Sequence, residues 1–219
     1  MKVNTDGVLL AALSEVRDPL NILDVGTGTG LIALMLAQKY PFSLIHAVEI
    51  DELAANTAKE NFSNSPFSER IKSWHSSIEN FWGSNKTKYD LIVSNPPFFI
   101  NSLRSGNPVK EKARHTDSTF FEQLVAGSEK QLSETGLFYL ILPLQTADRV
   151  KKICSLNGIL HVQKEIMVHS FPESKPHRSI LVFGLEKLVP VYYEVAIYEK
   201  AGIYTSEYRN LLKDYLTIF

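Results

Sequence analysis

Cysteine is nearly absent from this sequence: Cys154 is the only one among 219 residues. A single thiol cannot form an intramolecular disulfide, and it excludes a zinc site built from several cysteines. This usage suits a reducing cytoplasm, where we expect the protein to work. The sequence also lacks a run of about 20 uninterrupted apolar residues, so we expect no membrane-spanning helix. Its start lacks the charged and then apolar segments of a signal peptide.

An excess of charge of one sign is missing as well, with 23 Lys and Arg residues against 24 Asp and Glu residues. A basic surface for nucleic acid must therefore be local rather than global. The six histidines show no metal-ligand spacing, and we predict no metal site. With 44% hydrophobic residues, a chain of this length can bury a large core without disulfides or metal.

Short segments that favour strands alternate with stretches that favour helices. Seven segments are predicted to be strands: 20–25, 43–50, 71–75, 89–94, 137–142, 160–168 and 179–186. Helices are expected at 31–39, 51–62 and 119–132, a long polar loop at 100–118, and a further strand and a helix within 191–219.

This alternation predicts a parallel sheet with helices on both faces. The last two of the seven strands have no helix between them, so we expect them to form an antiparallel hairpin. We therefore predict an α/β fold with a doubly wound, mainly parallel, seven-stranded sheet and an antiparallel hairpin at one edge. We expect one domain over residues 1–219, with 191–219 as a C-terminal strand-helix extension.

A glycine-rich loop follows the first strand, with Asp24 ahead of Gly26, Gly28 and Gly30. Glycines there let the backbone approach a ligand closely, and the following helix offers free N–H groups. The spacing is not that of the dinucleotide fingerprint, which needs a glycine one position after Gly30. Glu49, at the end of the second strand, can bind ribose hydroxyls. Asp24 suits an ammonium or sulfonium group; the alternative is a tight turn without a ligand.

The segment Asn95-Pro96-Pro97-Phe98 follows the fourth strand, where open parallel sheets place their ligand crevice. The prolines fix the backbone and have no N–H, so the Asn95 side-chain oxygen and the Pro96 carbonyl become two rigid acceptors. Two acceptors that bind both hydrogens of an exocyclic amine favour its pyramidal form, in which the lone pair is free to react. Phe98 can stack on a planar substrate. The alternative is a stiff turn with a buried aromatic ring.

Together these motifs resemble class I S-adenosylmethionine-dependent methyltransferases, which have a Rossmann-like sheet. An N-P-P-[FY] segment is typical of members that modify planar amines or amides: adenine-N6, guanine-N2 and glutamine-N5 enzymes. The finer resemblance is to the bacterial tRNA1(Val) adenine-N6 methyltransferase family. It rests on the opening Thr5-Asp6-Gly7-Val-Leu-Leu, on Asn95-Pro-Pro-Phe-Phe99, on Ala113-Arg114-His115, and on the ending Glu207 to Tyr215.

The resemblance implies roles for further residues around an S-adenosylmethionine cofactor. It places Thr5, Asp6 and Gly7 near the methionine end of the cofactor, the loop from Asp24 to Gly30 and Asn95 along it, and Glu49 on its ribose. Ser77 stands where an acid often contacts the adenine of the cofactor, so that contact is expected from Ser76, Ser77 or Ile78. Asn4 stands where glycine is common. The family usually has residues ahead of this opening, so a basic RNA-binding arm is expected to be missing here.

Two basic segments are candidates for binding RNA. The first follows the Asn95 motif and could bind phosphates, although a solvated mobile loop is the equal alternative. The second lies between the strands 160–168 and 179–186 and mixes Phe171 with cations. The expected RNA-binding residues are Phe98, Phe99, Arg104, Lys110, Lys112, Arg114, His115, Lys175 and Arg178.

The resemblance implies methylation of N6 of adenosine 37, beside the anticodon of tRNA1(Val), by an enzyme that we expect to be a monomer. Three other functions stay open. One is glutamine-N5 methylation of a release factor, although those enzymes usually carry tyrosine at the position of Phe98 and have a separate helical N-terminal domain. The others are guanine-N2 methylation of rRNA and an inactive RNA-binding module that keeps the fold.

Overall fold

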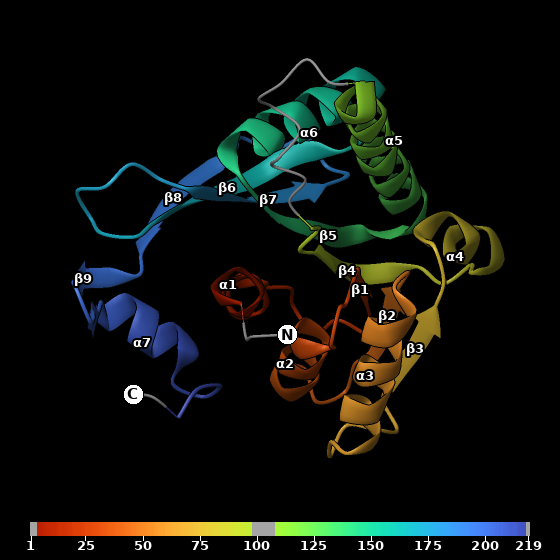
Figure 1. The fold of residues 1–219 in the computed structure, drawn as a ribbon, viewed down its shortest axis with the longest axis horizontal. Coiled ribbons are helices and arrows are strands. Elements are labelled where there is room, and N and C mark those ends of the chain that lie inside the picture. Colours follow the sequence, from red (N-terminus) through yellow and green to blue (C-terminus); the bar gives the residue numbers. More distant parts are fainter. Residues whose placement is uncertain (1–3, 98–107, 218–219) are drawn as a thin grey trace.

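The computed structural model describes residues 4–97 and 108–217, with only the backbone described for 108–118. One sheet of eight strands runs through the molecule in the order β3-β2-β1-β4-β5-β7-β6-β8 (Figure 1). The strands are β1 Asn21–Val25, β2 Leu44–Glu49, β3 Ile71–His75, β4 Tyr89–Ser94, β5 Leu132–Leu142, β6 His161–His169, β7 Arg178–Gly184 and β8 Val191–Ala196. Two short strands, β9 Tyr198–Lys200 and β10 Ile203–Tyr204, form a separate antiparallel pair.

Seven helices accompany the sheet in the described parts of the chain. They are α1 Thr5–Leu13, α2 Leu31–Lys39, α3 Glu52–Ser63, α4 Ile78–Ser84, α5 Pro108–Gln131, α6 Leu144–Asn157 and α7 Ser206–Leu212. In Figure 1, α1, α2, α3 and α7 lie on one face of the sheet, and α4, α5 and α6 lie on the other. Each face carries its own cluster of buried apolar side chains.

The predicted α/β fold is confirmed, with all seven expected strands present and β6 and β7 antiparallel. The strand count was wrong by one, because β8 pairs in parallel with β6 and joins the same sheet. The β6–β7 hairpin is therefore not the edge of the sheet. The polar loop predicted at 100–118 was also wrong in part, since α5 already begins at Pro108. Helices α1, α4 and α6 were not expected from the sequence.

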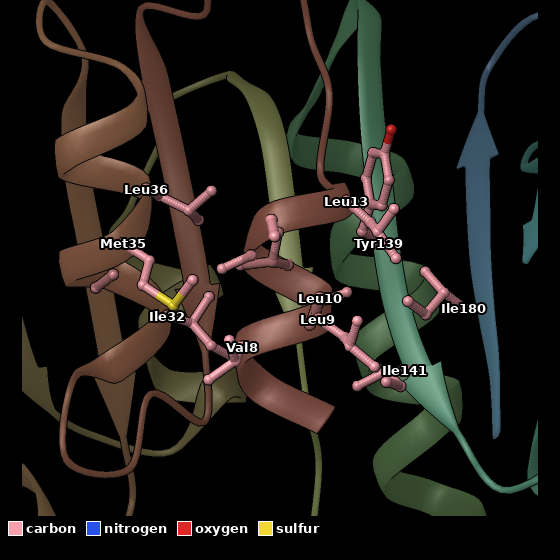
Figure 2. Close-up of a cluster of buried hydrophobic side chains, with 14 of the residues drawn as sticks. Val8, Leu9, Leu10, Leu13, Ile32, Met35, Leu36, Tyr139, Ile141 and Ile180 are labelled. Carbon is pink, nitrogen blue, oxygen red and sulfur yellow. The ribbon is translucent and has the colours of Figure 1, made fainter. Parts of the chain in front are cut away.

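Helix α1 occupies the centre of one face. All its residues from Asp6 to Leu13 are buried. Figure 2 shows Val8 beside Ile32 of α2, whereas Leu9 and Leu13 face Tyr139, Ile141 and Ile180 on β5 and β7. A helix that is apolar all round must be covered on every side, so α1 is fixed between α2 and the sheet.

The carboxyl ends of seven of the eight strands lie at one edge of the sheet. Strands β3, β2, β1, β4 and β5 are parallel. Strand β6 is parallel to them because it is antiparallel to β7, which is antiparallel to β5, and β8 pairs in parallel with β6. The glycine loop after β1, Glu49 at the end of β2 and Asn95 after β4 therefore share this edge. We call it the catalytic edge. Such an edge is where open α/β sheets bind their ligands.

Candidate active site

The glycine loop after β1 adopts a backbone that other residues rarely accept. Gly26, Gly28 and Gly30 have φ angles of +71°, +59° and +89°. Gly30 is also confined, because a Cβ atom there would lie 2.4 Å from the ring of Phe62 on α3. Since Gly30 caps the N-terminus of α2, this close approach of α3 fixes where the helix and its free N–H groups begin.

A cavity of about 640 Å³ lies against this loop. Its size is within the range of small-molecule and cofactor sites. The loop, α1, α2, α3 and the segment after β4 line it with Asn4, Gly7, Gly26, Thr27, Gly28, Thr29, Leu31, Ile32, Leu34, Asn61 and Asn95. Leu31, Ile32, Leu34 and Asn61 were not expected from the sequence. Nothing in the sequence marks Asn61, which reaches the loop only because α3 packs there and its Nδ2 donates to the Thr29 carbonyl at 2.9 Å.

Asp24 is fully buried below the loop. Its Oδ2 accepts a hydrogen bond from the Thr27 hydroxyl at 2.6 Å, while Oδ1 has no hydrogen-bond partner among the described residues. Burial raises the pKa of Asp24 to about 7, even though the Thr27 hydroxyl and the backbone of Ala33 both lower it. A buried acceptor without a partner costs free energy, so this oxygen favours a ligand that brings a donor or a positive charge.

Glu49 closes the loop from the end of β2. Its Oε2 accepts from the Gly28 N–H at 2.8 Å, and its Oε1 accepts from the N–H groups of Ile50 and Asp51, both at 2.9 Å. An ionised carboxylate offers about four acceptor positions, so Oε2 can take a further donor such as a ribose hydroxyl. Glu49 therefore holds the loop in place and keeps one position for a ligand.

Asn95 leaves β4 at the wall of the cavity. The preceding residue, Ser94, is buried and donates from its hydroxyl to the Val25 carbonyl at 2.8 Å, which ties β4 to the start of the glycine loop. Oδ1 of Asn95 is buried and has no hydrogen-bond partner among the described residues. Pro96 is buried and Pro97 is exposed. The Asn95 Oδ1 atom is thus fixed beside the cavity, where it can accept a hydrogen bond from a ligand.

The first turn of α1 lies against Asn95. A Cβ atom on Gly7 would lie 3.7 Å from Nδ2 of Asn95 and 3.5 Å from Ile32. Asn4 caps the helix by accepting from the Asp6 N–H at 3.1 Å, and Thr5 is exposed. Gly7 therefore lines the cavity. Asp6 is buried and does not line the cavity.

Asp6 instead pairs with Arg178, the first residue of β7. Nε of Arg178 donates to Oδ2 of Asp6 at 2.8 Å, and the guanidinium also donates to the His177 carbonyl at 2.9 Å. The Asp6 side chain is 9% exposed and the Arg178 side chain is 22% exposed. From the sequence, Asp6 was expected to lie at the cofactor and Arg178 to bind RNA. The structure joins them in one ion pair.

The segment after β3 carries the residues expected to hold the adenine of the cofactor. The Ser76 N–H donates to the Glu49 carbonyl at 2.9 Å, which fixes this segment next to the end of β2. The Ser77 hydroxyl accepts from the Asn80 N–H at 3.3 Å and caps α4, and Ile78 is buried. Ser77 is therefore used as a helix cap.

Comparisons with known proteins agree with this geometry. A model of the methyltransferase small domain family matches residues 4–153. A protein from Pedobacter heparinus named tRNA1(Val) (adenine(37)-N6)-methyltransferase is 46% identical, covering 100% of this chain and 92% of that protein. A protein of the same name from Bacteroides thetaiotaomicron is 39% identical, covering 98% and 90%.

The chain belongs to the methyltransferase small domain family. Its fold is also that of solved methyltransferase structures. A predicted O-methyltransferase from Agrobacterium tumefaciens has a TM-score of 0.74 at 16% identity, covering 95% of this chain and 96% of that one. TrmN from Thermus thermophilus has a TM-score of 0.59 at 21% identity, covering 83% and 48%.

S-adenosylmethionine is the cofactor of this class of methyltransferases, and the site fits it. The cavity lies on the glycine loop, whose backbone comes close to any ligand there. The unpartnered Oδ1 of Asp24 suits the positively charged end of the cofactor, and the open position on Oε2 of Glu49 suits a ribose hydroxyl.

The expected RNA-binding residues fall into three groups. Phe98, Phe99 and Arg104 lie outside the described residues. Lys110, Lys112, Arg114 and His115 belong to the first half of α5, where only the backbone is described. In the β6–β7 turn, Lys175 is exposed, whereas Arg178 is half-buried and paired with Asp6.

His46 and Asp90 make contacts that support the sheet. Nδ1 of His46 lies 2.7 Å from the Tyr89 hydroxyl, and burial lowers the pKa of His46 to about 4. Asp90 accepts from the N–H groups of Leu20 and Asn21 at 2.8 and 3.0 Å and so fixes the start of β1 against β4. Within the described residues there is no cluster of metal-ligating side chains and no helix able to span a membrane.

Proposed function

We propose that this protein methylates N6 of an adenine in tRNA, and that its target is adenosine 37 beside the anticodon of tRNA1(Val). The observation that carries the chemistry is the buried, unpartnered Oδ1 of Asn95 at the wall of the cavity. The specific substrate is supported by the names of relatives that are 46% and 39% identical over nearly the whole chain. We infer that the enzyme acts in the cytoplasm.

The difficulty of the reaction is the weak nucleophile. The lone pair of an adenine N6 amine is delocalised into the ring, so it is not available for attack on carbon. Oδ1 of Asn95 and the Pro96 carbonyl would accept hydrogen bonds from the two amine hydrogens and favour the pyramidal amine. Fixed dipoles directed at developing charge are commonly the largest contribution to catalysis. S-adenosylmethionine, when bound, supplies the electrophilic methyl group.

Positioning supplies a second contribution. Ser94 and the two prolines hold Asn95 on β4, and the first turn of α1 closes its other side. Rigid placement of reacting atoms at about 3–3.5 Å can lower the barrier by several kcal/mol. The amine loses its proton only after it has been methylated, so the site needs no general base. The target base must leave its stack to reach Asn95.

The alternative substrates differ in what they would present to Asn95. A glutamine side-chain amide or a guanine N2 amine could use the same two acceptors, so the acceptor geometry alone does not select adenine. The full-length relatives favour adenine in tRNA. An inactive RNA-binding module would have no need for a buried acceptor without a partner, which is costly to keep.

The decisive experiment is transfer of labelled methyl from S-adenosylmethionine to total tRNA, followed by nucleoside analysis. We expect the label in N6-methyladenosine. Label in protein or in methylguanosine would identify one of the alternative substrates. No transfer to any of these substrates, with cofactor binding confirmed by calorimetry, would favour the inactive module.

Asn95→Ala tests the acceptor. We expect it to lower kcat by at least about 100-fold, the usual effect of losing one transition-state hydrogen bond, while the Kd for S-adenosylmethionine changes little. Asn210→Ala, an exposed position on α7, is the matched control and should be active. Near-normal turnover of Asn95→Ala would remove Asn95 from the chemistry.

A further inference from the structure

The turn between β6 and β7, residues 170–177, projects from the catalytic edge. It begins at the carboxyl end of β6 and ends at Arg178, whose guanidinium contacts Asp6 in the first turn of α1. The next residue of that turn, Gly7, lies against Asn95. An ion pair and the first turn of α1 therefore connect this turn to the wall of the cavity where Asn95 lies. In Figure 1 the turn is the extended loop at the left end of the sheet, above β9 and α7.

Hydrogen bonds hold this turn in one conformation. The Ser174 hydroxyl accepts from the Phe171 N–H at 3.0 Å and donates to the Phe171 carbonyl at 2.7 Å, and the Ser174 N–H donates to that carbonyl at 2.9 Å. Nδ1 of His169 lies 2.6 Å from the Ser174 carbonyl. Pro172 further limits the backbone. The turn thus presents Phe171 at a fixed place and not as part of a flexible loop.

The Phe171 ring is 38% exposed and is supported from behind by a row of aromatic rings. Its centroid lies 5.9 Å from that of Tyr198, which stacks on Tyr204 at 4.9 Å, which stacks on Tyr208 at 5.1 Å. Tyr208 is only 4% exposed and belongs to the apolar cluster around α1. The Tyr198 N–H also donates to the Ser170 carbonyl at 2.9 Å. The C-terminal segment therefore braces the ring of Phe171 against the core.

We propose that Phe171 is a stacking site for an unpaired base of the tRNA anticodon loop, one that neighbours the target adenosine. This inference rests on the proposed function. When the target base leaves its stack, each neighbouring base loses a stacking partner. An aromatic ring at the catalytic edge can take the place of that lost partner. The exposed Lys175 on the same turn is placed to contact a backbone phosphate of that nucleotide.

Stacking on one ring is tolerant of base identity, because every base has a π-face. The site therefore contributes affinity and orientation more than sequence discrimination. A rigid, braced ring suits this role, since little side-chain freedom is lost on binding. The row of rings also gives the 191–219 extension a function beyond completing the sheet, because all three bracing tyrosines, Tyr198, Tyr204 and Tyr208, come from it.

The test compares Phe171→Leu with Phe171→Trp. Leucine keeps an apolar side chain on the turn but removes the aromatic face, whereas tryptophan keeps the face. We expect Phe171→Leu to raise the Kd for tRNA by about 5- to 100-fold, and Phe171→Trp to bind within about threefold of the wild type. In both variants, the melting temperature and the Kd for S-adenosylmethionine should change no more than they do in a control variant. Phe42→Leu is that control, since Phe42 is 90% exposed just before β2, at the opposite edge of the sheet.

A spectroscopic readout separates stacking from a structural role. With 2-aminopurine in place of the nucleotide on either side of the target, binding should quench fluorescence at one of the two positions in the wild type and in Phe171→Trp, but not in Phe171→Leu. Equal tRNA affinity of Phe171→Leu and the wild type would overturn the proposal, as would a loss of affinity with no change in quenching. Methylation of tRNA by the wild type in the same series shows whether the proposed function itself holds.

Discussion

Nε of Arg178 and Oδ2 of Asp6 lie 2.8 Å apart, although the two residues are 172 positions apart in the sequence. The pair connects the first turn of α1 to the start of β7 at the catalytic edge. Gly7, the neighbour of Asp6, lines the cavity together with Asn95 and Ile32, and a Cβ atom on it would lie within 4 Å of both. The placement of Asn95 therefore depends on an ion pair whose members do not line the cavity themselves.

Breaking this pair should affect stability and turnover together. Asp6→Asn removes the carboxylate that pairs with the half-buried Arg178 guanidinium, and we expect it to lower the free energy of unfolding by about 1–3 kcal/mol, with kcat falling more than the Kd for cofactor rises. The double variant Asp6→Asn with Arg178→Gln should lose less than the sum of the two single variants, as measured by denaturant unfolding. Additive losses would mean that the two side chains act independently.

The buried carboxyl of Asp24 predicts a stability that depends on pH. Its pKa is raised from 3.8 to about 7, so between these values the folded state binds the proton more tightly than the unfolded state. The free energy of unfolding should therefore fall as the pH rises from about 4 to about 7, by an amount on the order of a few kcal/mol.

Asp24→Asn should remove this decline, because its amide does not titrate. We expect the variant without cofactor to be more stable than the wild type at pH 8 and to bind S-adenosylmethionine at least about tenfold more weakly, which is the common conflict between stability and function. Urea unfolding at pH 5 and pH 8, with calorimetry of cofactor binding, measures both effects. Parallel pH profiles for the two proteins would contradict the assignment.

Gly30 should tolerate no side chain. Gly30→Ala combines a positive φ with a contact of 2.4 Å to Phe62, and we expect it to lower the free energy of unfolding by about 2–4 kcal/mol and to weaken cofactor binding. Gly158→Ala is the matched control, since its φ is +72° but no atom lies within 4 Å of the added Cβ. It should cost about 1 kcal/mol. Equal losses in the two variants would show that backbone strain alone is responsible.

Arg114 tests the basic segment at the start of α5. We expect Arg114→Ala to raise the KM for tRNA and to flatten its dependence on salt, because a lost phosphate contact releases fewer counterions. The measurement is KM at several salt concentrations, with kcat and the Kd for cofactor as controls. A salt slope equal to that of the wild type would exclude Arg114 from the RNA footprint.

Local chemistry in the sequence was enough to predict the frame of the site. Short apolar segments identified the seven strands, because a strand that is buried on both faces has an almost continuous apolar sequence. The glycines of the loop and the two prolines after Asn95 each constrain their own backbone, so their positions indicated a ligand loop and a rigid acceptor before any contact was known. The resemblance of these motifs to a methyltransferase family added the cofactor and the substrate class.

Only the tertiary structure decided which side chains meet. Asp6 and Arg178 carry charges that sequence analysis assigned to two different ligands, and their pairing depends on how α1 packs against β7. Asn61 reaches the cavity because α3 covers the glycine loop, and β8 joins the sheet because β6 offers it a free edge. Each of these contacts joins segments far apart in the chain, so no local pattern in the sequence records it. The sequence thus determined the backbone of the site, and the packing of α1, α3 and the C-terminal segment determined its walls.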